Sequence, residues 1–130
     1  MTLFTHKVRG DHRGNLVAIE SAIDVPFDIK RVFYIFGTSP GTNRGVHSHH
    51  RTRQYLIALN GSCKVTLDNG FENKIYTLDD PSIGLLQDIY IWGTMHDFSP
   101  DCVLLVLASE GYDADDYIHD YEEFLSEVSV

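Results

Sequence analysis

"QYLIALNGSCKVTLDNG" (residues 54–70) contains two short apolar runs, and each run is followed by residues typical of a tight turn. Asn60-Gly61 follows the first run and Asn69-Gly70 follows the second; these residue types tolerate the positive φ angles that tight turns require. Six similar runs, also separated by turn residues, are LVAIE (16–20), IKRVFYIF (29–36), KIYTL (74–78), IGLL (83–86), IYIW (89–92) and CVLLVLA (102–108). Many short strands at this spacing predict an all-β sandwich or barrel.

The C-terminal segment, Asp113–Val128, departs from the strand pattern. Its apolar residues recur at helical spacing, and acidic residues crowd its start, where a helix dipole favours negative charge. The segment therefore predicts one C-terminal amphipathic α-helix.

The chain has 130 residues, of which 43% are hydrophobic. This size and composition predict a single domain spanning residues 1–130. The sequence contains neither a membrane-spanning run of roughly 20 apolar residues nor a secretory signal, so we expect a soluble, cytoplasmic protein. Cys63 and Cys102 each lie in an apolar run, and we expect buried free thiols rather than a disulfide.

The charge is unevenly distributed along the chain. All ten Lys and Arg residues lie at or before Lys74, and thirteen acidic residues follow it. The overall charge of −9 argues against nucleic-acid binding, which needs a basic surface for phosphates. If a phosphorylated small molecule binds, its charge must be met by arginines such as Arg44, Arg51 and Arg53.

These three arginines flank the most unusual part of the sequence, "RGVHSHHRTRQ" (residues 44–54), which has a strand-like pattern. Side chains alternate between the two faces of a strand, so His47 and His49 are expected on one face and His50 on the other. A same-face histidine pair beside arginines favours acid/base chemistry or metal binding over a purely structural role.

The spacing of Gly41, His47, His49, Gln54 and Gly61 resembles the first motif of the cupin barrels, and GTMH (93–96) resembles the end of their second motif. In metal-binding cupins the position of Gln54 is normally a glutamate, which joins three histidines as ligands. A neutral amide offers a divalent ion less charge compensation. We therefore predict no metal, while a three-histidine site of His47, His49 and His96 remains an alternative.

A closer resemblance covers nearly the whole chain, from about Val8 to Phe124. The matching strings are RGNLVAIE, IKRVFYIF, RGVHSH, LNGSCKVTLDNG, MHDFSPDCVLLVLAS and YDADDYI. Together they resemble the nucleotide-sugar 3,4-ketoisomerases, metal-independent cupins that act on dTDP-4-keto-6-deoxy-D-glucose in the making of 3-amino-3,6-dideoxy sugars. The resemblance implies a cupin-type antiparallel β-barrel (jelly roll), a homodimer and no cofactor.

The resemblance also implies roles for individual residues. His49 corresponds to the base that removes the C3 proton, and His47 to the group that delivers a proton to C4. Histidine suits both tasks because its ordinary pKa of about 6.5 lies near neutrality. The predicted substrate-binding residues are Tyr34, Arg44, Arg53, Gln54, Trp92 and His96.

Two other functions remain open on the residues alone. One is a non-catalytic sugar-nucleotide-binding cupin, and the other is a metal-dependent cupin enzyme. The paired histidines flanked by arginines favour catalysis over binding, and Gln54 in the glutamate position disfavours a metal.

Overall fold

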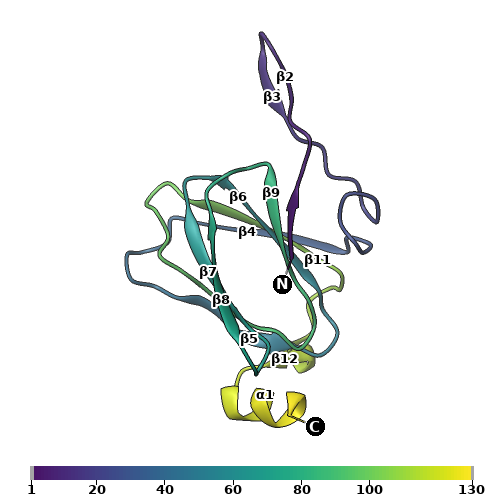
Figure 1. Cartoon of the computed structure of the whole chain (residues 1–130), viewed down its shortest axis with the longest axis vertical. Coiled ribbons are helices and arrows are strands. Elements are labelled where there is room, and N and C mark those ends of the chain that lie inside the picture. The colour runs from purple at the N-terminus through teal and green to yellow at the C-terminus, as the bar shows by residue number, and fades with distance from the viewer. Residues whose placement is uncertain (1, 130) are drawn as a thin grey trace.

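A computed structural model describes residues 2–129 and contains two five-stranded antiparallel sheets, one small hairpin and one C-terminal helix (Figure 1). The first sheet has the order β1-β9-β6-β11-β4 and the second β12-β5-β10-β7-β8. The predicted all-β barrel with a C-terminal helix is confirmed. The strands are β1 (Thr2–Thr5), β2 (Arg9–Asp11), β3 (Gly14–Leu16), β4 (Arg31–Phe36), β5 (Arg44–His49), β6 (Gln54–Asn60), β7 (Cys63–Asp68), β8 (Asn73–Leu78), β9 (Ile83–Gln87), β10 (Trp92–His96), β11 (Val103–Ala108) and β12 (Tyr117–Ile118).

The main core lies between the two sheets, because alternate residues of each strand face inward. On β11, Leu104 and Val106 are fully buried in this core, whereas Leu107 packs on the outer side of the sheet. Cys63 and Cys102 are buried free thiols, as predicted. No helix within residues 2–129 is long and apolar enough to span a membrane.

The outer side of the first sheet is covered by irregular chain between β3 and β4. Val25 and Phe27 are buried there against Tyr55 and Leu86, and Ile19 packs on the same cluster. The predicted strand 16–20 is therefore wrong beyond Leu16, because Ile19 packs on a sheet face, partly buried, without pairing as a strand. β2 and β3 instead form a hairpin that projects from the barrel (Figure 1).

A second predicted strand, 89–92, is also wrong for most of its length. Ile89 and Tyr90 form a turn, and β10 begins only at Trp92. Tyr90 has a positive φ of 55°, which a strand does not accommodate, and its backbone N–H donates to the His49 carbonyl at 2.9 Å. The apolar run therefore combines a turn with the start of a strand.

The predicted helix 113–128 is correct only in its second half. Helix α1 covers Tyr121–Val128, while Ala114–Asp116 form a 3₁₀ turn, η1, and Tyr117–Ile118 form β12. The cause is a contact distant in sequence. Asp116 is buried and accepts hydrogen bonds from the backbone N–H groups of Arg51 (2.6 Å) and Thr52 (3.1 Å), and this anchors the segment beside β5.

Candidate active site

The two predicted catalytic histidines lie side by side on β5. The ring centroids of His47 and His49 are 4.8 Å apart, and the ring of Tyr117 lies 4.9 Å from the first and 4.5 Å from the second. Pairing of β12 with β5 sets Tyr117 opposite His49. His50 forms a separate hydrogen bond at 3.1 Å with the Tyr90 hydroxyl. The three neighbouring histidines thus divide into a pair and a separate residue.

Both paired histidines are neutral at physiological pH. Burial lowers the pKa of His47 to about 4, and His49 and His119 add to the lowering. Burial likewise lowers the pKa of His49 to about 4; Asp116 opposes this change and Arg31 reinforces it. A neutral imidazole has a free nitrogen lone pair, so each ring is able to accept a proton.

Several buried polar atoms beside the pair have no hydrogen-bond partner within residues 2–129. They are His47 Nδ1, Ser48 Oγ, His49 Nε2 and Gln54 Oε1. Leaving a buried polar group unpaired costs roughly 1–3 kcal/mol, so such groups are rare in ordinary cores. Their concentration around the two histidines indicates a site where a polar ligand would supply the missing hydrogen-bond partners.

A pocket opens next to the pair. Its walls come from β4, β5, β6, β10 and β12, and the lining residues are Arg31, Phe33, Ile35, Asn43, Arg44, Gly45, His47, Gln54, Met95 and Tyr117. Three predicted residues, His47, Arg44 and Gln54, thus line the pocket. His49 does not line it but lies against His47, with its side chain buried. Arg44 is exposed at the pocket and Gln54 is buried in it.

The pocket is cationic on one side. An Nη atom of Arg31 lies 3.4 Å from the Tyr117 hydroxyl, and the guanidinium carbon lies 4.7 Å from the centre of the Phe33 ring. Arg31 and Arg44 both reach the pocket, and among the described residues no carboxylate lines it. This environment suits an anion, or a negative charge that develops during a reaction.

His96, the third histidine of the metal alternative, has other partners in this structure. His96 is hydrogen-bonded to the Thr66 hydroxyl at 2.7 Å through Nε2 and to Asp97 at 2.7 Å through Nδ1. Within residues 2–129 no group of three or more His, Cys, Asp or Glu side chains is placed to hold a metal ion.

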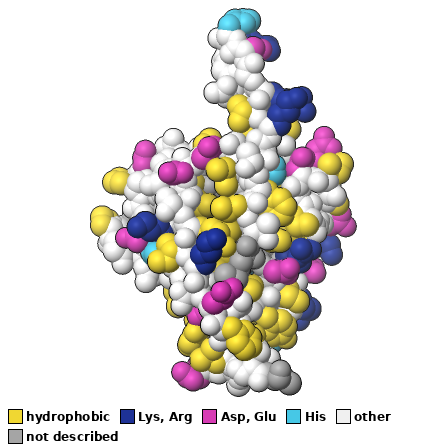
Figure 2. Space-filling model, viewed as in Figure 1, with side chains coloured by type: hydrophobic (Ala, Val, Ile, Leu, Met, Phe, Trp, Pro, Cys, Tyr) yellow, Lys and Arg dark blue, Asp and Glu magenta, His cyan; other side chains and the backbone are white. Residues whose placement is uncertain are grey.

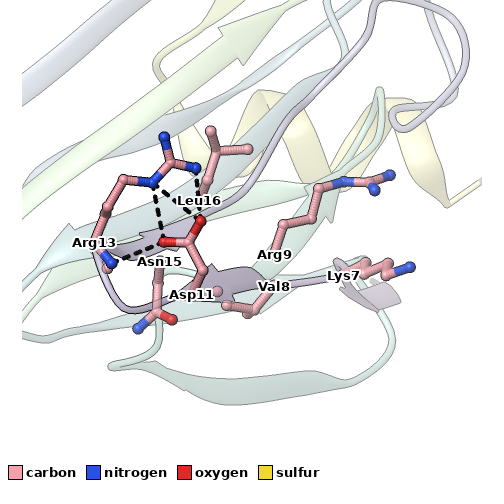
Figure 3. A pocket seen from close by; sticks show the side chains of 9 residues that line it. Lys7, Val8, Arg9, Asp11, Arg13, Asn15 and Leu16 are labelled. Atoms are coloured by element: carbon pink, nitrogen blue, oxygen red, sulfur yellow. Dashed lines mark hydrogen bonds and ion pairs between the residues drawn. The ribbon is translucent and has the colours of Figure 1, made fainter.

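A second hollow lies on the projecting hairpin, away from the histidines (Figure 3). Lys7, Arg9 and Arg13 supply cations there, and the Arg13 guanidinium is paired with Asp11 at 2.6 Å. All four residues are exposed. The hollow has no buried polar group, and we assign the candidate active site to the histidine pocket.

Comparison with known proteins identifies the family of the chain. The FdtA family, described as WxcM-like, C-terminal, matches residues 1–129. The chain belongs to the FdtA family. A curated relative, the TDP-4-oxo-6-deoxy-alpha-D-glucose-3,4-oxoisomerase of Aneurinibacillus thermoaerophilus, is 52% identical over 114 residues, which are 88% of this chain and 82% of the relative.

Solved structures of similar proteins share the whole fold of this FdtA-family chain. QdtA, a sugar 3,4-ketoisomerase from Thermoanaerobacterium thermosaccharolyticum, is 48% identical in its complex with TDP, with a TM-score of 0.96. A histidine-to-asparagine mutant of QdtA, 47% identical and with the same TM-score, is in complex with TDP-4-keto-6-deoxyglucose. Each match covers 98% of this chain and 93% of QdtA.

Four residues predicted to bind substrate lie outside the histidine pocket of this FdtA-family protein. Tyr34 is 61% exposed on the outer face of β4. Arg53 pairs with Asp88 at 3.2 Å, and Trp92 packs under α1 in a separate cluster. His96 lines a neighbouring hollow on β10. Their predicted substrate contacts gain no support from these positions.

Sequence reasoning missed Arg31 and Tyr117, which line the pocket. Arg31 alternates with Phe33 and Ile35 on the inward face of β4, so strict alternation along this strand would have pointed to it. Tyr117 had no such signal, because helical spacing assigned it to the wrong element. The buried Asp116 that anchors this segment was missed for the same reason.

Proposed function

We propose that this FdtA-family protein is a dTDP-sugar 3,4-ketoisomerase. It moves the keto group of dTDP-4-keto-6-deoxy-D-glucose from C4 to C3 through an enediol, in the biosynthesis of 3-amino-3,6-dideoxy sugars. The observation that carries the proposal is the close pair of histidines on one strand face, with His49 buried and His47 half-buried, beside two arginines and a tyrosine. The curated relative with the same activity supports it.

His49 acts as the base that removes the C3 proton. The C4 carbonyl acidifies that proton, and the neutral imidazole of His49 has an unpaired, buried Nε2 to receive it. His49 is only 2% exposed, so bulk water does not compete for this nitrogen. Proton transfer by a positioned side chain typically accelerates a reaction by about 10²- to 10⁴-fold.

Negative charge develops on the carbonyl oxygen when the C3 proton leaves. Arg31 and the Tyr117 hydroxyl, which lie 3.4 Å apart beside the pair, are placed to stabilise this charge. Arg44 is exposed at the pocket and suits the diphosphate of the nucleotide, since its planar fork matches phosphate oxygens. Gln54 Oε1 is free to accept a hydrogen bond from a sugar hydroxyl.

His47 delivers the second proton, to C4. Meanwhile the C3 hydroxyl loses its proton and the C4 oxygen gains one, so the reaction ends as a C3 ketone and a C4 hydroxyl with no net change in protons. The protein's own residues supply every group this scheme needs, and we propose no metal or other cofactor. Activity is accordingly expected to survive prolonged chelation; loss on chelation with recovery on adding one metal would contradict this part.

The proposed enzyme is a homodimer. The outer face of β4 exposes Val32, Tyr34 and Phe36 by 56%, 61% and 67%, and Figure 2 shows apolar side chains exposed over the barrel below the projecting hairpin. A second copy would remove this apolar surface from water. Light scattering should report a dimer that Tyr34→Glu dissociates, whereas Phe71→Glu, at a 79% exposed position in the β7–β8 turn, should leave it intact.

The proposed location is the cytoplasm. Two buried thiols in the free state, Cys63 and Cys102, suit a reducing compartment.

The decisive experiment is incubation of the purified protein with dTDP-4-keto-6-deoxyglucose in deuterated water, followed by NMR of the sugar. We expect a 3-keto product that carries deuterium at C4. Binding of the nucleotide sugar without any conversion would favour the non-catalytic alternative.

A further inference from the structure

His119 has a position that the proposed mechanism does not yet use. It follows β12, and its ring stacks on that of Tyr117 with centroids 5.4 Å apart and an interplanar angle of 9°. Its centroid lies 5.8 Å from that of His47, at 88°. β12 pairs Tyr117 with His49 and Ile118 with Ser48, and continuing this antiparallel register brings His119 opposite His47.

His119 is also the exposed member of this group of rings. Within residues 2–129, the ring neighbours of His47 are His49, Tyr117 and His119. His49 is buried and Tyr117 half-buried, whereas His119 is exposed to solvent. A path from solvent to His47 through a titratable nitrogen therefore passes through His119.

The proposed reaction requires such a path. After one turnover His49 holds the proton from C3, and His47 has given one to C4. The enzyme returns to its starting state only when His49 loses a proton and His47 gains one. A neutral imidazole that donates its N–H proton must accept another at its second nitrogen, and His47 is half-buried at the pocket that the substrate would fill.

We propose that His119 relays protons between solvent and His47. This inference rests on the proposed ketoisomerase function. During turnover His47 donates its N–H proton to C4 and receives a proton from His119, which is reprotonated by solvent or buffer, and His49 releases the proton from C3 to solvent once the product has left the pocket. Their ring centroids are 5.8 Å apart, a separation that one bridging water molecule would span. The relay itself changes only N–H bonds, while in the sugar C–H and O–H bonds change and the carbonyl double bond moves from C4 to C3 through the enediol.

The test compares the parent with His119→Asn at fixed pH and ionic strength while the imidazole concentration is varied. The parent should be insensitive to imidazole. The variant should lose about tenfold in kcat in weak buffer with its KM unchanged, a smaller loss than the 10²- to 10⁴-fold expected of a primary acid or base. Added imidazole should restore its rate to a plateau, because a small diffusible base replaces the missing ring.

His12→Asn, which removes an exposed histidine from the hairpin turn, is the matched control and should behave as the parent does. Parent-like kcat in His119→Asn, or a loss that imidazole does not restore, would overturn the relay while leaving the ketoisomerase function intact. So would product in deuterated water that retains the original C3 hydrogen at C4. An inactive parent would refute the function and the relay together.

Discussion

The barrel interior has a polar part, the histidine pocket, and an apolar part, the main core. The same strands contribute side chains to both parts. On β6, Gln54 lies in the histidine pocket, whereas Leu56 and Ala58, on the same inward face, lie in the apolar core. On β4, Arg31 lines the pocket, and Ile35 reaches the core. Within two or three inward positions, each strand passes from polar to apolar surroundings.

The two parts make different contributions. The apolar part removes side chains from water, and it supplies most of the free energy of folding. The polar part holds imidazole and amide groups whose partners are incomplete, which costs stability. The same burial keeps the imidazoles of His47 and His49 neutral, so the arrangement that costs stability also leaves both rings able to accept a proton.

The largest expected effect is the loss of turnover in His49→Asn, which keeps size and polarity but removes the titrating nitrogen. We expect kcat to fall by about 10²- to 10⁴-fold, with exchange of the C3 proton stopped. The melting temperature should stay equal or rise, because the unpaired imidazole costs stability. Full activity in this variant would end the assignment of His49 as base.

A substitution in the apolar part should have the opposite effect, lowering stability but not kcat. Leu104 is fully buried in the main core, so Leu104→Ala should reduce the free energy of unfolding by about 2–5 kcal/mol. The kcat of the remaining folded protein should be nearly unchanged, as measured at a temperature well below the melting point. A loss of kcat comparable to that of His49→Asn would mean that the two parts are not separable.

Lowering the pH should reduce the free energy of unfolding through the two paired histidines. The pKa of each paired histidine is about 4 in the folded state and near 6.5 in the unfolded chain, so protons bind the unfolded chain first as pH falls. Stability should therefore be complete above pH 6.5 and fall towards pH 4, by up to about 3 kcal/mol per histidine. In urea titrations over this range, His49→Asn should show a shallower pH dependence than the parent.

Arg44 lies at the exposed edge of the pocket and tests how far the polar part extends. Arg44→Ala should raise KM for the nucleotide sugar by roughly tenfold, since one charge-assisted contact contributes about 1.5–3 kcal/mol when fully formed and less when exposed. The value of kcat should fall as well only if the guanidinium faces the enediolate. Unchanged KM and kcat would remove Arg44 from the site.

The smallest effect is expected at His50, the neighbour of His49 that bonds Tyr90 instead of entering the pocket. His50→Asn should retain parent-like kcat and KM in the same assay. Equal losses at positions 47, 49 and 50 would show that the strand face assigned to the pair is wrong.

Strand alternation and turn residues were enough to predict the barrel, because in strands such as β6 and β7 the apolar residues and the turn that follows are adjacent in sequence. The same alternation placed His47 and His49 together correctly. It did not place Trp92, whose burial beneath α1 depends on a helix far along the chain. Nor did it reveal Tyr117, because Asp116 is fixed by backbone groups at positions 51 and 52, and spacing within 113–128 contains no sign of that contact.

Because Asp116 lies late in the sequence, the surroundings of the histidine pair are completed late in translation. The histidine pair is complete at residue 49, yet the carboxylate of Asp116 and the strand that flanks the pair are translated 67 and more residues later. Burial alone would raise the pKa of Asp116, but hydrogen bonds from Thr52 and Arg51 lower it below its ordinary value, so this late partner arrives ionised. Nascent chains that stop before β12 should contain both histidines and yet lack a working site, so premature termination leaves no partly active isomerase in the cell.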